Sequence, residues 1–169
     1  MRGLAYDGPM ARRLPRWLRW GVVGLLAIFV AIQFVPYGRD HTNPPVTQAA
    51  AFAPGPGLEL ARGTCFDCHS NETAWPWYTN IAPGSWLVQR DVDEGRATLN
   101  FSEWDRPQAE VDELLDVVQD GEMPPVSYTL IHPSARLSDA ERATLLAAME
   151  QMLRDSPPIQ GEGEPEDED

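Results

Sequence analysis

Five consecutive residues constrain this chain more than any other feature: Cys65, Phe66, Asp67, Cys68 and His69 spell C-x-x-C-H. Two thiols three positions apart lie on one side of a helical turn, where they can reach the two vinyl groups on one edge of a porphyrin, and the next imidazole can bind the iron. This is the attachment signature of c-type haem, and the chain has no other cysteine. The motif therefore predicts one covalent haem c on Cys65 and Cys68, with His69 as the proximal iron ligand.

The second axial ligand has to come from elsewhere in the chain. Met123 lies in the loop Gly121-Glu122-Met123-Pro124-Pro125 rather than on an apolar stripe, and its flanking prolines would stiffen that loop. A thioether is a soft, neutral ligand that favours reduced iron and raises the potential. Met123 is therefore the predicted sixth ligand. His132 is the alternative and would give bis-histidine iron, and an open or water-bound position is the third possibility.

Aromatic residues are dense soon after the motif. They are Trp75, Trp77, Tyr78, Trp86, Phe101 and Trp104. Indole and phenol groups combine a large apolar area with an N–H or O–H donor. We therefore expect Trp75, Trp77 and Tyr78 to bind the cofactor by excluding water and hydrogen-bonding the haem propionates, with ordinary core packing as the alternative. We assign no catalytic residue from the sequence.

Charge is divided unevenly along the chain. Through Arg39 there are six arginines and one acid, whereas from Asp40 onward seven arginines stand against 25 acids, a net charge of −18. An acidic domain of this kind is repelled by nucleic acid, which excludes a nucleic-acid-binding function, and it can be steered toward a basic redox protein partner. Among its few arginines, Arg62, Arg90 and Arg96 are candidates for pairing with haem propionates, although surface arginines are the commoner case.

An uncharged apolar run extends from Trp20 to Val35. The arginines that precede it are Arg12, Arg13, Arg16 and Arg19. By the positive-inside rule this pattern places the N-terminus in the cytoplasm and everything after Pro36 outside. The run is short against the roughly 20 residues of a usual span, but no small-x-small cleavage site closes it, which favours an uncleaved anchor over a signal peptide. A buried core helix is the remaining alternative. The expectation is a single-pass protein of the bacterial cytoplasmic membrane, with its C-terminal domain in the periplasm.

Composition divides the chain into five expected segments. They are a cytoplasmic arm over 1–17, a transmembrane anchor over 18–37, a Pro/Gly-rich linker over 38–57, a haem-binding domain over 58–156 and a disordered acidic tail over 157–169. Segments rich in Pro and Gly are typical of tethers, and a tail this acidic and poor in apolar residues cannot pack.

Helical patterns dominate the domain. One helix is expected to run from Leu58 into the motif, one from Trp86 to about Glu94, and one from Pro107 to Gly121 with an apolar face at i, i+3, i+4, i+7. A last helix is expected after Ser138, whose spacing to Glu141 forms a capping box. Pro157 and Pro158 are expected to end this helix. No alternating run predicts a strand. The expected class is all-α, a small cytochrome c-like helical domain around one covalent haem.

Together these residues resemble the bacterial haem-binding domain family. The resemblance rests on 65–73, 75–78, 81–83, 85–87, 91–92, 95–96, 99–102, Trp104, 123–125, Tyr128, His132 and 137–138. It implies covalent haem on Cys65 and Cys68 with His69 as an axial ligand, and it settles neither partner nor reaction. The order of helix, motif, helix, Met-Pro and last helix is more distantly similar to small class I cytochromes c, which implies Met123 as the sixth ligand.

Two function classes follow from a haem of this kind. The leading hypothesis is electron transfer by a membrane-anchored cytochrome, an electron carrier rather than an enzyme. The alternative is a haem-based sensor or a peroxidase-like enzyme with an open or displaceable sixth ligand, for which His132 or Glu122 would be the distal acid–base group. A redox dithiol would be expected in a thioredoxin-like β/α domain, and structural zinc needs four ligands, so the helical pattern and the few cysteines and histidines oppose both.

Overall fold

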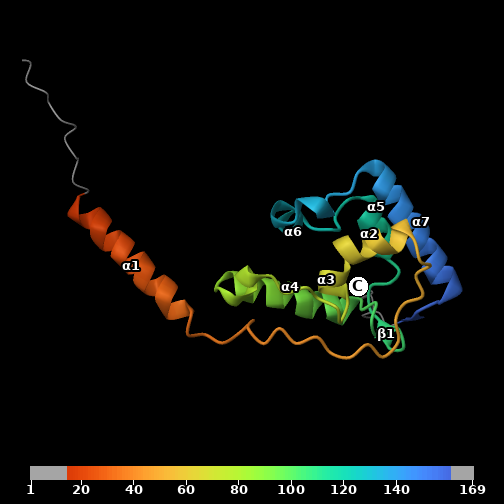
Figure 1. Cartoon of the computed structure of the whole chain (residues 1–169), viewed down its shortest axis with the longest axis horizontal. Helices are drawn as coiled ribbons and strands as arrows, with labels where there is room; N and C mark the ends of the chain where they lie inside the picture. The colour runs from red at the N-terminus through yellow and green to blue at the C-terminus, as the bar shows by residue number, and fades with distance from the viewer. Residues whose placement is uncertain (1–14, 161–169) are drawn as a thin grey trace, which may run out of the picture. The chain divides into compact units, whose positions relative to one another are not determined.

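The structure is a computed structural model, and it describes residues 15–160. It divides into two compact units, Met1–Pro36 and Tyr37–Asp169 (Figure 1). The predicted cytoplasmic arm and acidic tail lie mostly outside the described residues.

The first unit contains helix α1 (Arg16–Ile32) and corrects the expected membrane anchor over 18–37. The helix has 17 residues, of which Arg16 and Arg19 are charged, and it ends before Gln33. Its uncharged part is therefore shorter than the roughly 20 apolar residues that cross a bilayer. Within residues 15–160 no helix is long and apolar enough to span a membrane. The prediction of a single-pass membrane protein with a periplasmic domain is therefore wrong.

The second unit is mostly helical, as predicted. Its helices are α2 (Pro56–Thr64), α3 (Phe66–His69), the short 3-10 helix η1 (Trp77–Asn80), α4 (Gly84–Thr98), α5 (Leu114–Gln119), α6 (Val126–Ile131), the 3-10 helix η2 (Pro133–Ala135) and α7 (Asp139–Asp155). Two residues of β1 (Pro107–Gln108) pair in parallel with two of β2 (Ile159–Gln160), Pro107 opposite Ile159. In the part of the chain that the structure describes, these are the only strands with more than one residue.

The helix ends show where local signals decide and where tertiary contacts do. Ser138 and Glu141 form the expected capping box at the start of α7. In contrast, the helix expected from Pro107 begins only at Leu114, because Pro107 joins β1 and the amide of Ala109 donates to the carbonyl of Thr98, 2.9 Å away. The end of α4 and strand β2 thus compete successfully with helix formation in this segment.

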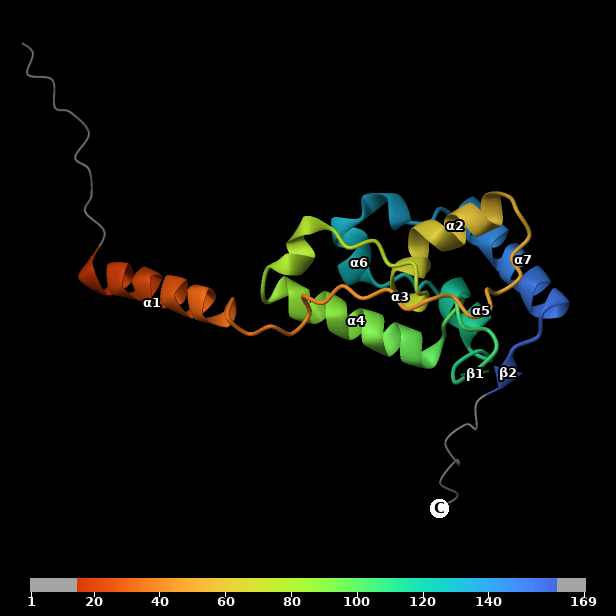
Figure 2. The same cartoon turned by 60° about the horizontal axis from the view of Figure 1, so that its bottom comes forward.

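The core lies where α2 and α7 pack side by side (Figure 2). A β-carbon on Gly57 of α2 would overlap the side chain of Ala148 on α7, so the two helices are in close contact. Phe66, the first variable residue of the motif, is buried and stacks on Phe101 at 5.5 Å between ring centroids. Phe101 stacks in turn on the buried Trp104 at 5.9 Å. The motif helix α3 is therefore anchored in the core by its own side chain.

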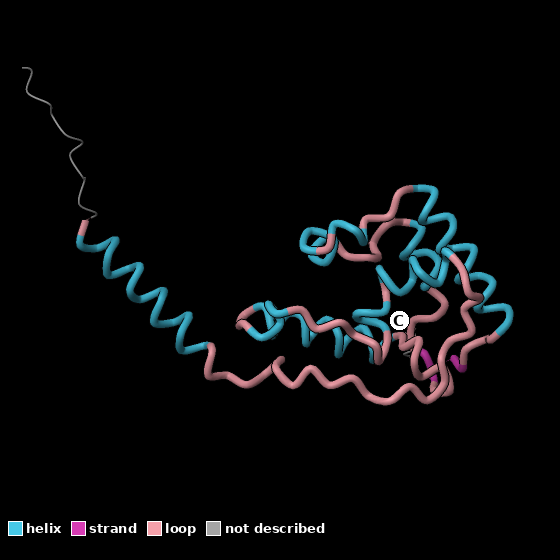
Figure 3. Tube along the Cα trace, viewed as in Figure 1, coloured by secondary structure: helices cyan, strands magenta, loops and turns pink. Residues whose placement is uncertain are grey.

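Residues 41–52, which we call the strap, run as an extended loop along the domain (Figure 3). They belong to the range expected to be a linker. The amide of Ala50 donates to the carbonyl of Phe101 (2.8 Å), and the amide of Trp104 donates to the carbonyl of Gln48 (2.8 Å). Phe52 packs edge-on against Phe101 at 5.4 Å. The strap is therefore held by both backbone hydrogen bonds and core contacts.

Candidate haem site

The C-x-x-C-H motif lies on two nearly continuous helical turns. Cys65 caps both the end of α2 and the start of α3, and its amide donates to the carbonyl of Ala61 at 2.9 Å. The amides of Cys68 and His69 donate back to the carbonyl of Cys65 at 3.1 and 2.9 Å. Both cysteines are free and half-buried. The structure thus presents two unpaired thiols one turn apart, directly before the histidine.

The environment of the thiols keeps them protonated. Burial raises the pKa of Cys65 to about 11, and a hydrogen bond with the Thr64 hydroxyl (3.2 Å) offsets only part of this. Burial, then the nearby carboxylates of Asp91 and Asp67, raise the pKa of Cys68 to about 12. Catalytic dithiols require the opposite shift, toward thiolate at neutral pH. The site is therefore unsuited to dithiol redox catalysis.

His69 is held by two backbone carbonyls from the end of α4. Its Nδ1 lies 3.0 Å from the oxygen of Gly95 and 3.1 Å from that of Leu99. Carbonyl oxygens only accept hydrogen bonds, so Nδ1 carries the proton and Nε2 keeps its lone pair, which is the form that binds metal. Burial lowers the pKa of His69 and favours this neutral form.

Asp67, inside the motif, connects it to two later segments. Its Oδ1 accepts from the amide of Ala74 at 2.9 Å, and its backbone carbonyl accepts from the hydroxyl of Thr73 at 2.7 Å. Its Oδ2 accepts from the hydroxyl of Tyr128 on α6 at 2.7 Å. Burial, followed by this hydrogen bond, raises the pKa of Tyr128, so the phenol remains a donor. The motif is thereby tied both to the loop that follows it and to α6.

The two candidates for the distal ligand lie in different surroundings. Met123 is 38% exposed and lines a cavity of about 180 Å³ together with Pro124 and residues that include Arg136; none of the three motif residues Cys65, Cys68 and His69 lines this cavity. His132 is half-buried, and its Nε2 lies 2.8 Å from the hydroxyl of Tyr78. Met149 and Met152, in contrast, are fully buried in the core.

The predicted aromatic residues separate into two groups. Tyr78 and His132 are brought together by their hydrogen bond, and the ring of Tyr128 packs on that of His132 at 4.2 Å. Trp75 instead faces the strap: it stacks on His41 at 4.6 Å, and its Nε1 donates to the side chain of Asn43 at 3.1 Å. Trp77, the third residue expected to contact the haem, is 76% exposed.

Tyr128 is the site residue that pattern reasoning did not single out. It contributed only to the family resemblance, whereas the structure places its hydroxyl on the motif itself. The signal in the sequence is the spacing of Tyr128 and His132, because residues four apart on a helix share a face. Nothing local to Asp67 identifies the partner, since 61 residues separate the two.

The three arginines considered for the propionates are all engaged by the protein. Arg62 pairs with Glu72 at 2.8 Å, and Arg90 pairs with Glu94 at 2.7 Å. Arg96 donates to four oxygens: the carbonyls of Ser70 (2.8 Å) and Thr42 (3.1 Å), and the side chains of Asn43 and Thr73 (both 2.9 Å). Arg96 therefore joins the strap to the segment that follows the motif.

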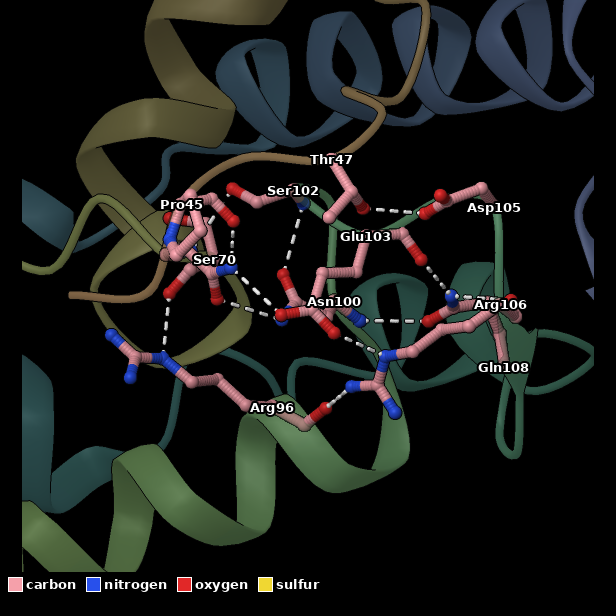
Figure 4. Close-up of polar contacts among 11 residues, drawn as sticks. Pro45, Thr47, Ser70, Arg96, Asn100, Ser102, Glu103, Asp105, Arg106 and Gln108 are labelled. Atoms are coloured by element: carbon pink, nitrogen blue, oxygen red, sulfur yellow. Dashed lines mark hydrogen bonds and ion pairs between the residues drawn. The ribbon is translucent and has the colours of Figure 1, made fainter.

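A buried polar network fixes the end of the motif (Figure 4). Asn100 donates to the side chain of Asn71 at 2.9 Å, and its backbone amide donates to the side chain of Gln108 at 2.8 Å. Asn71 donates in turn to the carbonyl of Pro45 on the strap, 3.1 Å away. The amide of Phe101 also donates to the carbonyl of His69 at 2.8 Å. The histidine is thus held through both its side chain and its backbone.

Comparison with known proteins supports haem binding by this chain. A family model described as a haem-binding domain matches residues 27–151, which is most of the chain. The chain belongs to the haem-binding domain family. It is also 31% identical over 91 residues to cytochrome c peroxidase Ccp of Escherichia coli (strain K12), a match that covers 49% of this chain and 20% of that protein. The chain thus spans about a fifth of the length of this curated relative. No solved structure matches it.

The donors of this haem-binding domain fit a haem better than a metal ion held by protein ligands alone. Within 15–160, no three His, Cys, Asp or Glu side chains gather as a metal site. The motif supplies two free thiols and an imidazole nitrogen with a lone pair. Trp86 adds a buried indole N–H that has no hydrogen-bond partner among the described residues, and a propionate is a group that accepts from such a donor. On α6, Val126 and Leu130 are 72% and 64% exposed, which leaves apolar surface to cover a porphyrin.

Proposed function

We propose that this haem-binding domain is a monohaem c-type cytochrome domain that carries electrons. Cys65 and Cys68 would hold the haem through thioether bonds, and His69 would be its proximal ligand. The observation that carries the proposal is the orientation of His69, whose Nδ1 is bonded to the Gly95 and Leu99 carbonyls and whose Nε2 remains available beside two free thiols. When bound, the haem supplies a one-electron Fe(III)/Fe(II) couple.

The residues around the motif contribute orientation and a dry environment. The carbonyls of Gly95 and Leu99 fix the imidazole tautomer and strengthen it as a ligand. Phe66 anchors the motif helix in the core, and the half-buried position of Tyr78 limits the access of water. A site held this firmly changes little in geometry on electron transfer, which favours a carrier.

We assign the sixth position to Met123, with His132 as the alternative. Met123 is partly exposed on a loop, whereas Met149 and Met152 are fully buried. Its amide donates to the carbonyl of Val117 at 3.0 Å, which fixes the backbone of the loop while leaving the thioether uncommitted. The Nε2 of His132, by contrast, is already bonded to Tyr78.

The charge of the chain favours a basic redox protein as the electron-transfer partner. From Asp40 onward the net charge is −18, and opposite charges accelerate the encounter of two redox proteins. The association rate should therefore fall steeply as salt is added.

The likeness to part of a cytochrome c peroxidase supports a second candidate, a peroxidase-like or sensor haem protein with an open or displaceable sixth position. The paired hydroxyl and imidazole of Tyr78 and His132 would then supply the polar groups that such chemistry needs.

One experiment tests the assignment and separates the two candidates. The full chain is produced with a c-type cytochrome maturation system and run on a denaturing gel stained for haem peroxidase activity, beside the Cys65→Ala/Cys68→Ala double variant. A stained band for the wild type alone is expected, and an unstained wild type would overturn covalent attachment. Carbon monoxide is then added to the reduced protein: slow binding supports the electron carrier, and fast binding supports the second candidate.

A further inference from the structure

Helix α6 is weakly held by apolar packing. It has six residues, none of which is buried, and Val126, Leu130 and Ile131 are 72%, 64% and 58% exposed. Its neighbour in space is η2, the next element along the chain. A helix this short without a buried face does not stay in place through its own propensity. Specific side-chain bonds must therefore hold it on the domain.

Two hydrogen bonds connect α6 and its C-cap to distant parts of the chain. Tyr128 donates to Asp67 of the motif at 2.7 Å, and the C-cap residue His132 is bonded to Tyr78 at 2.8 Å. Arg136 also donates to the carbonyl of Thr129, but it lies only seven residues away on the same segment and does not tie α6 to the rest of the domain. The bond to Asp67 is the stronger of the two long-range bonds by type, since its acceptor is a carboxylate.

The bond to Asp67 reaches the motif directly. Asp67 lies between the two cysteines, and its other carboxylate oxygen is already fixed by the amide of Ala74. The acceptor is therefore rigid. On the other side, only Pro124 and Pro125 separate Met123 from the start of α6, and proline has a fixed φ. A displacement of α6 is thereby transmitted to Met123.

We propose that Tyr128 is a positioning residue for the sixth position: through Asp67 it ties α6, and with it the Met123 loop, to the motif helix. This inference rests on the proposed function, because the loop matters only if Met123 occupies that position. Tyr128 does not touch the iron. It sets how often the Met123 loop moves away from the sixth position, and hence how readily an external ligand reaches the iron.

The test compares two tyrosine variants in the haem-loaded full chain. Tyr128→Phe removes the hydroxyl and keeps the ring, and Tyr37→Phe is the matched control, since Tyr37 is half exposed and lies outside the site. We expect carbon monoxide to bind the reduced Tyr128→Phe protein about tenfold faster than wild type, the size expected for losing a bond to a charged group. Tyr37→Phe should bind at the wild-type rate, and both variants should stain for haem.

An unchanged rate of carbon monoxide binding in Tyr128→Phe would overturn the proposal. If the urea midpoint fell while the rate stayed the same, Tyr128 would be merely structural. If Tyr128→Phe does not fold, Asp67→Asn replaces it, because an amide keeps the oxygen for Ala74 and weakens the acceptor for Tyr128; it must then raise the rate by a smaller factor, and an unchanged rate again overturns the proposal.

A separate readout distinguishes this inference from the proposed function. Hydrogen exchange in the full chain as isolated should lose protection at 126–131 in Tyr128→Phe whether or not haem is attached. A wild type without covalent haem would refute the proposed function while leaving this readout intact. Unchanged protection in Tyr128→Phe would show that the hydrogen bond between Tyr128 and Asp67 does not hold α6 on the domain.

Discussion

A β-carbon on Gly95 would lie 2.7 Å from the carbonyl oxygen of Cys68, so α4 meets the motif helix where only glycine fits. This close approach brings the end of α4 to the histidine that follows Cys68. The carbonyl of Gly95 itself, and that of Leu99 one turn later, are the two acceptors of the imidazole proton. One small residue therefore sets both the packing of the motif and the orientation of its proposed iron ligand.

The Gly95→Ala variant should be destabilised by about 1–3 kcal/mol, because the clash is with backbone atoms that cannot move aside alone. Gly63→Ala is the matched control: a β-carbon there meets nothing within 4 Å, and alanine is the better helix former. It should be neutral or stabilising by up to about 1 kcal/mol. Urea unfolding of the two variants measures the difference. Equal stabilities would show that α4 does not need this contact.

Arg96→Gln should cost about 2 kcal/mol of unfolding free energy, because oxygen acceptors on the strap and on the segment after the motif lose their guanidinium donor, and two of these bonds are partly buried. Arg90→Gln removes an arginine from the same helix, but its ion pair with Glu94 is exposed, so its loss should change the unfolding free energy far less. Proteolysis within 41–52 should be faster in Arg96→Gln alone. If both variants are cleaved like the wild type, Arg96 does not hold the strap.

The parts of this site that could be predicted from sequence are those specified locally. Cys65, Cys68 and His69 lie within five consecutive residues, and the capping box of Ser138 and Glu141 spans one helical turn. Both can therefore be predicted without knowing the fold. The all-α class follows from helical periodicity over similarly short ranges.

The rest depends on partners far apart in the chain. Composition between 38 and 57 describes local flexibility, but it does not reveal that Arg96 and Phe101 bind part of this segment. Pro107 is a good first residue of a helix, yet strand pairing with Ile159 holds it elsewhere. Apolar composition alone also overestimates the length of the apolar helix in the first unit, which has 17 residues.

The thiols of protein made without haem should react slowly. With the pKa of Cys65 raised to about 11 from 9.0, the thiolate fraction at pH 8 is about 100-fold lower than in the unfolded chain, and lower still for Cys68 at about 12. Because thiolate is the reacting form, alkylation of the native protein should keep accelerating as the pH rises above 9, whereas in urea it should level off there. Mass spectrometry of iodoacetamide-treated protein measures both profiles. A native profile that levels off near pH 7 would instead indicate an activated dithiol.

Replacing Met123 by alanine should leave the haem attached and lower the reduction potential. A neutral thioether stabilises the reduced iron, so its loss should move the equilibrium toward the oxidised form by at least tenfold, or about 59 mV for one electron. Glu122→Ala, on the neighbouring exposed residue, is the control and should change the potential much less. Redox titration of His132→Ala completes the comparison. If that variant, rather than Met123→Ala, shows the large shift, then His132 must leave its bond with Tyr78 on haem binding, and the sixth ligand is the histidine.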